Sequence, residues 1–168
     1  MQRRTLLKLG AASAAVLIVA GGAAALLQPG LKGGVLSDSG REVFFAVGRA
    51  VLDKTLPANE GARQVALQGL LTRVDILVQS LPHHAQAELS QLLALLASTA
   101  GRRTLVGLSQ PWPEASIFDI QHALQDMRLS SLALRQQAYA ALHDITAGAY
   151  FSDPSSWPLL GYPGPLKI

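Results

Sequence analysis

A leucine-rich stripe over residues 67–81 constrains the fold of this chain more than any other feature. Its apolar side chains recur every three or four positions, so they cover one side of a helix along its whole length. Pro82 follows directly and can end this helix and begin another. The pattern predicts a helix over about 60–80 that is buried on one side. The stripe consists of Leu67, Leu70, Leu71, Val74, Leu77, Val78 and Leu81.

Four further segments show the same spacing and are separated by proline or glycine. They predict helices over about 38–54, 82–100, 114–128 and 130–149. The side chains expected to face the core are Phe44, Val47, Val51, Leu52, Leu89, Leu92, Leu93, Leu96, Ile117, Ile120, Leu124, Met127, Leu132, Tyr139, Leu142, Ile145 and Ala149. No segment alternates convincingly as a strand would. We therefore expect an all-α fold, a compact bundle of about five helices.

The boundaries of this helical domain, residues 38–149, follow from capping and breaking residues. Ser37 or Asp38 can cap the first helix, and Asn59 can cap the second. Residues 28–37 are rich in glycine and predict a flexible linker. Residues 101–112 contain Gly101, Gly107 and Pro111 and predict a break between helices.

The first 27 residues have the pattern of a twin-arginine export signal or membrane anchor. Arg3 and Arg4 precede Leu6, Leu7 and Lys8, and residues 9–27 form an uncharged apolar run. As a helix this run would be about 28 Å long, close to the hydrocarbon thickness of a bilayer. The pattern predicts transport by the twin-arginine translocase, which moves folded proteins, and a periplasmic location. Cleavage after Ala25 and retention in the inner membrane both stay open.

Charge and cysteine content exclude several classes of function. The formal net charge of +3 equals the charge of Arg3, Arg4 and Lys8, and the rest of the chain is neutral. It has no basic stripe, which argues against nucleic-acid binding. The chain has no cysteine, so it forms no disulfide, thiolate metal site or iron–sulfur cluster. We expect no cofactor in this chain.

The histidines offer little support for an enzyme. His122 has Asp119 and Asp126 at helical spacing, which suggests a carboxylate–histidine site or simply a solvated helix face. His143, beside Asp144, is expected to be structural. No phosphate loop or nucleophile elbow is present. A hydrolase or metal enzyme at His122 is the least favoured function.

The chain contains two pairs of neighbouring basic residues, and we interpret both as features of helix ends. His83 and His84 diverge on a helix and do not favour one shared metal. Arg102 and Arg103 follow the predicted third helix, where a cation favours the helix dipole. A partner-binding arginine pair is the alternative.

The last 19 residues, 150–168, combine prolines with large aromatic side chains. Pro154, Pro158 and Pro163 argue against continued helix and predict an extended tail. Tyr150, Phe151, Trp157 and Tyr162 are too apolar for a merely solvated tail, so it should pack on the bundle or on another protein.

The tail resembles the C-terminal signature of the gluconate 2-dehydrogenase subunit 3 family. The matching segments are Tyr150-Phe151-Ser152-Asp153-Pro154, then Trp157, then Gly161-Tyr162-Pro163-Gly164. The twin-arginine pattern also fits that family, whereas the middle of the chain agrees only in helical character. The resemblance implies a small, non-catalytic subunit of a membrane-associated dehydrogenase.

The resemblance also implies partners. A large flavoprotein of the glucose–methanol–choline type would bind FAD and oxidise an alcohol or sugar. It would be exported while attached to this subunit, and a cytochrome c subunit would accept the electrons. Six residues are the predicted partner-binding set: Tyr150, Phe151, Pro154, Trp157, Tyr162 and Pro163. The alternatives are a tail bound only to its own bundle, and a stand-alone periplasmic helical protein that binds a small ligand.

Overall fold

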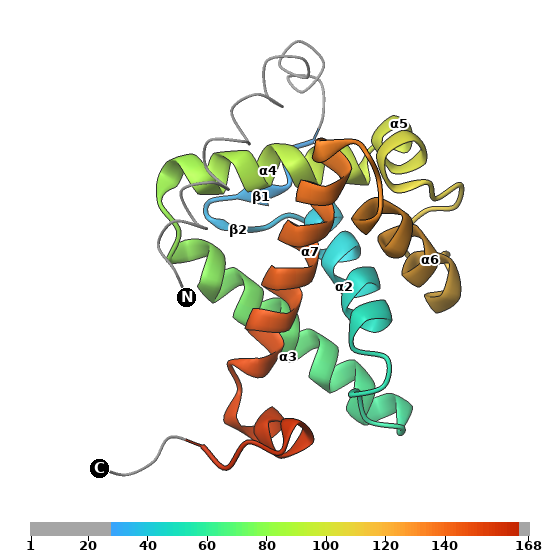
Figure 1. Cartoon of the computed structure of the whole chain (residues 1–168). Coiled ribbons are helices and arrows are strands. Elements are labelled where there is room, and N and C mark those ends of the chain that lie inside the picture. Colours follow the sequence, from blue (N-terminus) through green and yellow to red (C-terminus); the bar gives the residue numbers. More distant parts are fainter. Residues whose placement is uncertain (1–27, 165–168) are drawn as a thin grey trace.

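The computed structural model describes residues 28–164, and these residues form a mainly helical domain (Figure 1). Arg3, Arg4, Leu6, Leu7 and Lys8, with the apolar run 9–27, lie outside the described residues, as do residues 165–168. The all-α prediction is confirmed for the described part of the chain. No described helix is both long enough and apolar enough to cross a membrane.

The described elements follow one another as helices after a single short hairpin. Strands β1 (Leu31–Lys32) and β2 (Val35–Leu36) form the antiparallel hairpin. The α-helices are α2 (Asp38–Val51), α3 (Glu60–Gln79), α4 (His83–Ala97), α5 (Thr99–Gly101), α6 (Ile117–Arg128) and α7 (Ala133–Phe151). A π-helical turn, η1 (Arg102–Val106), follows α5, and a 3-10 helix, η2 (Pro154–Leu160), follows α7.

Polar side chains cap the start of α2 and of α3 at the positions that the sequence predicts. The Ser37 hydroxyl accepts a hydrogen bond from the Gly40 N–H, which satisfies one free donor at the start of α2. The Asn59 side chain likewise accepts a hydrogen bond from the Ala62 N–H at the start of α3. Both predicted caps are therefore confirmed, and α3 has almost the predicted bounds.

Helix α2 lies at the centre of the core and contacts α3, α4, α6 and α7 (Figure 1). Val43, Phe44 and Val47 of this helix are fully buried. Gly48 permits a close approach to α3, because a Cβ atom there would lie 2.6 Å from a methyl group of Leu70. The apolar stripe of α3 is buried as predicted at Leu67, Leu70, Leu71, Val74 and Val78.

The segment predicted as a flexible linker is instead built into the fold. Its glycines allow the hairpin, since Gly33 and Gly34 have φ values of 60° and 81°, a region that two-residue hairpin loops require. Leu31 and Leu36 are buried, and the Leu36 N–H donates to the Asp75 carboxylate at 2.8 Å. Asp75 also forms an ion pair with Arg41.

Residues 101–112 also differ from the prediction. Arg102–Val106 forms η1 instead of irregular chain, and Gly107, with φ of 90°, ends it. Trp112 is buried, and its indole N–H donates to the Leu96 carbonyl at 2.9 Å. Leu132 was expected to face the core but is 60% exposed, because α7 begins only at Ala133.

Candidate partner-binding tail

The tail begins where α7 ends and continues as a second, tighter helix. Asp153 caps η2 by accepting a hydrogen bond from the Ser155 N–H at 2.9 Å. Pro154 is tolerated at the first helical position, where no N–H is needed. Pro158 lies inside η2, and Gly161, with φ of 65°, ends it. The prediction of an extended chain is therefore wrong for Pro154–Leu160, since proline at these positions is compatible with a short 3-10 helix.

Arg73 of α3 fastens the tail to the bundle. Its Nε donates to the Ala149 carbonyl at 2.8 Å, near the end of α7. Its Nη1 donates to the Asp153 carboxylate at 3.0 Å, which also makes an ion pair. The guanidinium lies 6.0 Å from the centre of the Tyr150 ring, within reach of a cation–π attraction. One side chain thus joins three successive parts of the α7–tail junction.

Two ionisable groups at this junction have shifted pKa values. Burial raises the pKa of the Tyr150 phenol above its usual value, and the charge of Arg73 offsets only part of that effect. Hydrogen bonds from Ser155, with a smaller contribution from Arg73, lower the pKa of Asp153. Asp153 is therefore held in its charged form, which keeps the ion pair to Arg73.

The aromatic residues of the tail divide into a buried anchor and a surface pair. Tyr150 is 6% exposed and belongs to the core. Phe151 is partly buried and meets the Tyr150 ring edge-on, with the ring centres 5.2 Å apart. Trp157 is half-buried and donates its indole N–H to the Phe151 carbonyl at 3.0 Å. Tyr162 is exposed and contacts the Trp157 ring, with the ring centres 5.3 Å apart.

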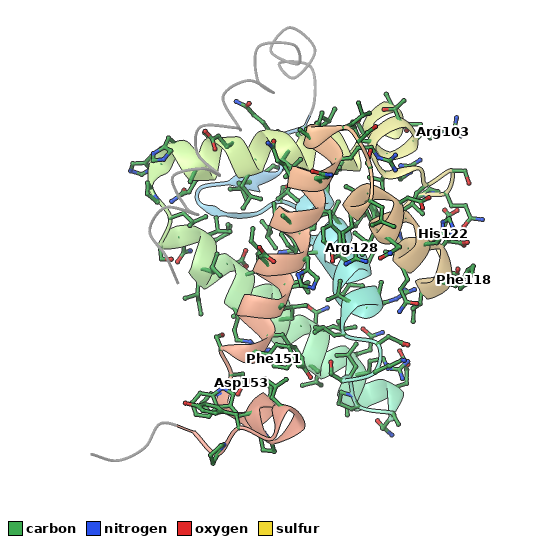
Figure 2. All side chains as sticks on the ribbon, in the orientation of Figure 1. Arg103, Phe118, His122, Arg128, Phe151 and Asp153 are labelled. Atoms are coloured by element: carbon green, nitrogen blue, oxygen red, sulfur yellow. The ribbon has the colours of Figure 1, made fainter. Side chains whose placement is uncertain are left out.

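The predicted partner-binding residues therefore lie in one segment but not on one face. Tyr150 points into the bundle, whereas Pro154, Tyr162 and Pro163 are exposed. Figure 2 shows Phe151 and Asp153 at the turn between α7 and η2. Sequence reasoning did not identify Ser156, which is buried and donates to the Asp153 carbonyl at 2.7 Å. The tail packs on its own bundle at its beginning and presents apolar side chains outward at its end.

The histidine sites show no catalytic arrangement in the described residues. His122 is 68% exposed on its side chain and pairs with Asp126 at 3.3 Å, whereas Asp119 is bound by the Ser116 hydroxyl at 2.7 Å. His143 pairs with its neighbour Asp144 at 3.0 Å. Within residues 28–164, no group of three His, Cys, Asp or Glu side chains could hold a metal ion.

Two depressions on the surface were considered as ligand sites. The larger, about 370 Å³, lies between residues 106–110 and α6 and includes Phe118 and His122, which Figure 2 labels on α6. The smaller, about 240 Å³, lies beside Arg49 and Glu60. Both are open to solvent, so neither has the enclosed apolar form expected for a stand-alone ligand-binding protein.

Arg102 does not occupy the exposed position expected of a helix-end cation. It is 7% exposed within η1, and its Nε has no hydrogen-bond partner in the part of the chain that the structure describes. Its neighbour Arg103 is exposed. The adjacent arginines thus have different environments, which the sequence alone did not distinguish.

Comparison of the chain with family models, curated proteins and solved structures found no match. The resemblance of the tail to the gluconate 2-dehydrogenase subunit 3 family therefore stays a prediction.

Proposed function

We propose that this chain is a non-catalytic small subunit that escorts, exports and assembles a periplasmic FAD-dependent alcohol or sugar dehydrogenase through the twin-arginine route. The observation that carries the proposal is the form of the tail. It is fixed to the bundle by Arg73 and Tyr150, and it exposes Tyr162 and Leu160 at 46% and 56%. A preordered apolar segment loses less conformational entropy on binding than a flexible one.

The types of side chain at the end of the tail support protein binding. Tryptophan and tyrosine are enriched among the residues that dominate interface energies. Trp157 and Tyr162 contact each other and stand beside exposed prolines. Tyr150 instead serves the fold, so the proposed contact surface is Pro154, Trp157, Leu160, Tyr162 and Pro163.

We assign the redox chemistry of the proposed complex to the partner subunits. The chain has no cysteine for a redox centre. In this proposal FAD and the substrate belong to the flavoprotein, and a membrane cytochrome c receives the electrons. Arg3 and Arg4 then direct the assembled complex to the twin-arginine translocase.

The proposal is tested by following flavin through export. The full chain is expressed with its flavoprotein partner, and protein-bound FAD and dye-linked dehydrogenase activity are measured in the periplasm and cytoplasm. Arg3→Lys with Arg4→Lys should leave both in the cytoplasm. Arg49→Lys with Arg63→Lys, the same change outside the signal, should leave export intact. Periplasmic FAD unchanged by the first pair, or a chain that is always purified from these cells without the flavoprotein, would overturn the proposal.

A further inference from the structure

Positive charge is concentrated in two segments of the domain. Residues 98–113 and 127–142 contain Arg102, Arg103, Arg128 and Arg135 and no carboxylate side chain. The eleven Asp and Glu residues of the chain lie elsewhere in the sequence, but Glu114 and Asp126 directly adjoin the two segments. Asp126 pairs with His122 at 3.3 Å. A protein whose net charge is small can still attract anions to one such region.

The fold brings these two segments together. The Nε of Arg135, in the first turn of α7, donates to the Leu105 carbonyl of η1 at 2.8 Å. Arg128 bonds the Gln125 amide oxygen at 3.1 Å instead of a carboxylate. Among the described residues, none of the four arginines forms an ion pair. Arg102, also in η1, is buried, and its Nε has no hydrogen-bond partner among the described residues.

Two exposed leucines lie between Arg128 and Arg135 in the sequence. Leu129 is 69% exposed and Leu132 is 60% exposed, on the short connection between α6 and α7. Ser131 between them is also exposed. We call Arg103, Arg128, Leu129, Leu132 and Arg135 the arginine–leucine patch. Figure 2 shows Arg103 and Arg128, which extend from η1 and from the end of α6.

We propose that the arginine–leucine patch binds the surface of an anionic phospholipid membrane. The leucines would enter the boundary between headgroups and acyl chains, and the arginines would pair with lipid phosphates. Isolated aliphatic side chains flanked by arginine suit this boundary, where apolar burial and attraction to anionic lipid act together. Arginine also matches phosphate oxygens with two parallel hydrogen bonds.

The place where the described chain begins favours a membrane over an acidic protein. Gln28 follows directly on the apolar run 9–27, which the sequence predicts to be a signal or anchor. A chain held in a bilayer by residues 9–27 would keep the domain, and with it the arginine–leucine patch, close to lipid. This inference does not depend on the proposed dehydrogenase partner.

The test uses the absence of cysteine in the chain. Leu132→Cys introduces a single thiol for an environment-sensitive fluorophore in the full-length protein. Val65→Cys is the matched control, since Val65 is an aliphatic residue 73% exposed on α3. Both proteins are mixed with vesicles of phosphatidylglycerol and phosphatidylethanolamine, and with vesicles of phosphatidylcholine. Quenching by a nitroxide lipid reports the depth of each label, which matters because residues 9–27 can bind vesicles on their own.

The proposal predicts quenching of the label at position 132, but not at 65, in the phosphatidylglycerol vesicles. Arg103→Ser and Arg128→Ser should each weaken the docking equilibrium about fivefold, and Lys54→Ser, which removes an exposed cation elsewhere, should not. Equal quenching at both positions, equal quenching in both vesicle types, or no quenching at position 132 would overturn it. The last result would leave an acidic protein as the occupant of the patch.

Discussion

At the scale of single residues, Arg73 has the largest number of separate roles at the α7–tail junction. It satisfies a carbonyl near the end of α7, neutralises Asp153 and covers the Tyr150 ring. Hydrogen bonds of this kind contribute more than neutral ones because one partner is charged. Most of the Arg73 side chain is shielded from water, since it is 23% exposed. The position of the tail should therefore depend on this residue.

Arg73→Ala should lower the free energy of unfolding by about 2 kcal/mol, because it leaves the Ala149 carbonyl without its donor and Asp153 without its counter-charge. Urea unfolding followed by circular dichroism measures the change. Limited proteolysis should cut the tail faster in this variant. Arg63→Ala, which removes a more exposed pair with Glu60, should change stability by less than about 1 kcal/mol. Equal effects from the two variants would contradict the role given to Arg73.

The lowered pKa of Asp153 leads to a prediction for how the tail responds to acid. A carboxyl whose pKa is lower in the folded state adds stability above its unfolded pKa, and that stability is lost as the pH falls through the folded pKa. Proteolysis of the tail should therefore accelerate in acid, below the usual range for an aspartate. Asp153→Asn should remove this pH dependence while keeping the side-chain shape. An unchanged profile in that variant would assign the acid sensitivity to another group.

At the scale of elements, glycines determine how closely helices and turns approach one another. A Cβ atom at Gly101 would lie 2.0 Å from the Leu95 carbonyl oxygen, which belongs to the backbone and cannot move away easily. At Gly148, in the last turns of α7, a Cβ atom would meet nothing within 4 Å. The same substitution should thus have opposite effects at these two positions.

Gly148→Ala should stabilise the domain by about 0.5–1 kcal/mol, because alanine loses less backbone entropy in a helix. Gly101→Ala should destabilise it by about 1–3 kcal/mol or more through overpacking at the α4–α5 junction. Thermal unfolding of both variants beside the wild type measures the difference. If both substitutions shift the melting temperature in the same direction, the close approach of Gly101 to the Leu95 carbonyl oxygen would be contradicted.

The sequence predicted long helices better than short elements. The bounds of α3 could be predicted because Asn59 caps its start, Pro82 follows its end and its apolar stripe is long. The hairpin was missed because each strand has two residues, too few to show alternation. The burial of Arg102 could not be predicted, since it depends on the π-helical turn that the neighbouring helices enclose.

At the candidate site, too, the sequence predicted only part of the structure of the tail. Its aromatic content correctly indicated packing, because Tyr150 and Phe151 join the core. Its prolines suggested extended chain, although Pro154 begins a 3-10 helix. The contact of the tail with Arg73 could not be predicted, because Arg73 is distant in sequence and carries no signal that links it to Asp153.

At the scale of the whole molecule, the two proposed contact surfaces lie at opposite ends of α7. This helix begins beside the arginine–leucine patch and ends at the tail (Figure 1). Tyr150 belongs to the core that supports both ends, whereas Trp157 lies outside it. Changes at these two aromatics should therefore separate folding from assembly.

Trp157→Ala should abolish most binding to the flavoprotein, with a loss of about 2 kcal/mol or more, while the melting temperature of the isolated chain stays close to wild type. Tyr150→Ala should instead lower the free energy of unfolding by about 3–5 kcal/mol, because it leaves a cavity in the core. Titration calorimetry with the purified flavoprotein and thermal unfolding give the two quantities. A large loss of intrinsic stability in Trp157→Ala would show that the tail serves only its own bundle.

Helix α7 is an unbroken rod of 19 residues, about 28 Å long. In the proposed assembly, anything bound at the tail would be separated from a membrane-bound arginine–leucine patch by up to roughly this length. In this proposal the subunit holds no cofactor, so a flavin held there would pass its electrons directly to the membrane acceptor and not through this subunit. The acceptor would have to rise beside the domain to meet the flavoprotein directly. The length of one helix would thus limit the height at which electrons leave the enzyme.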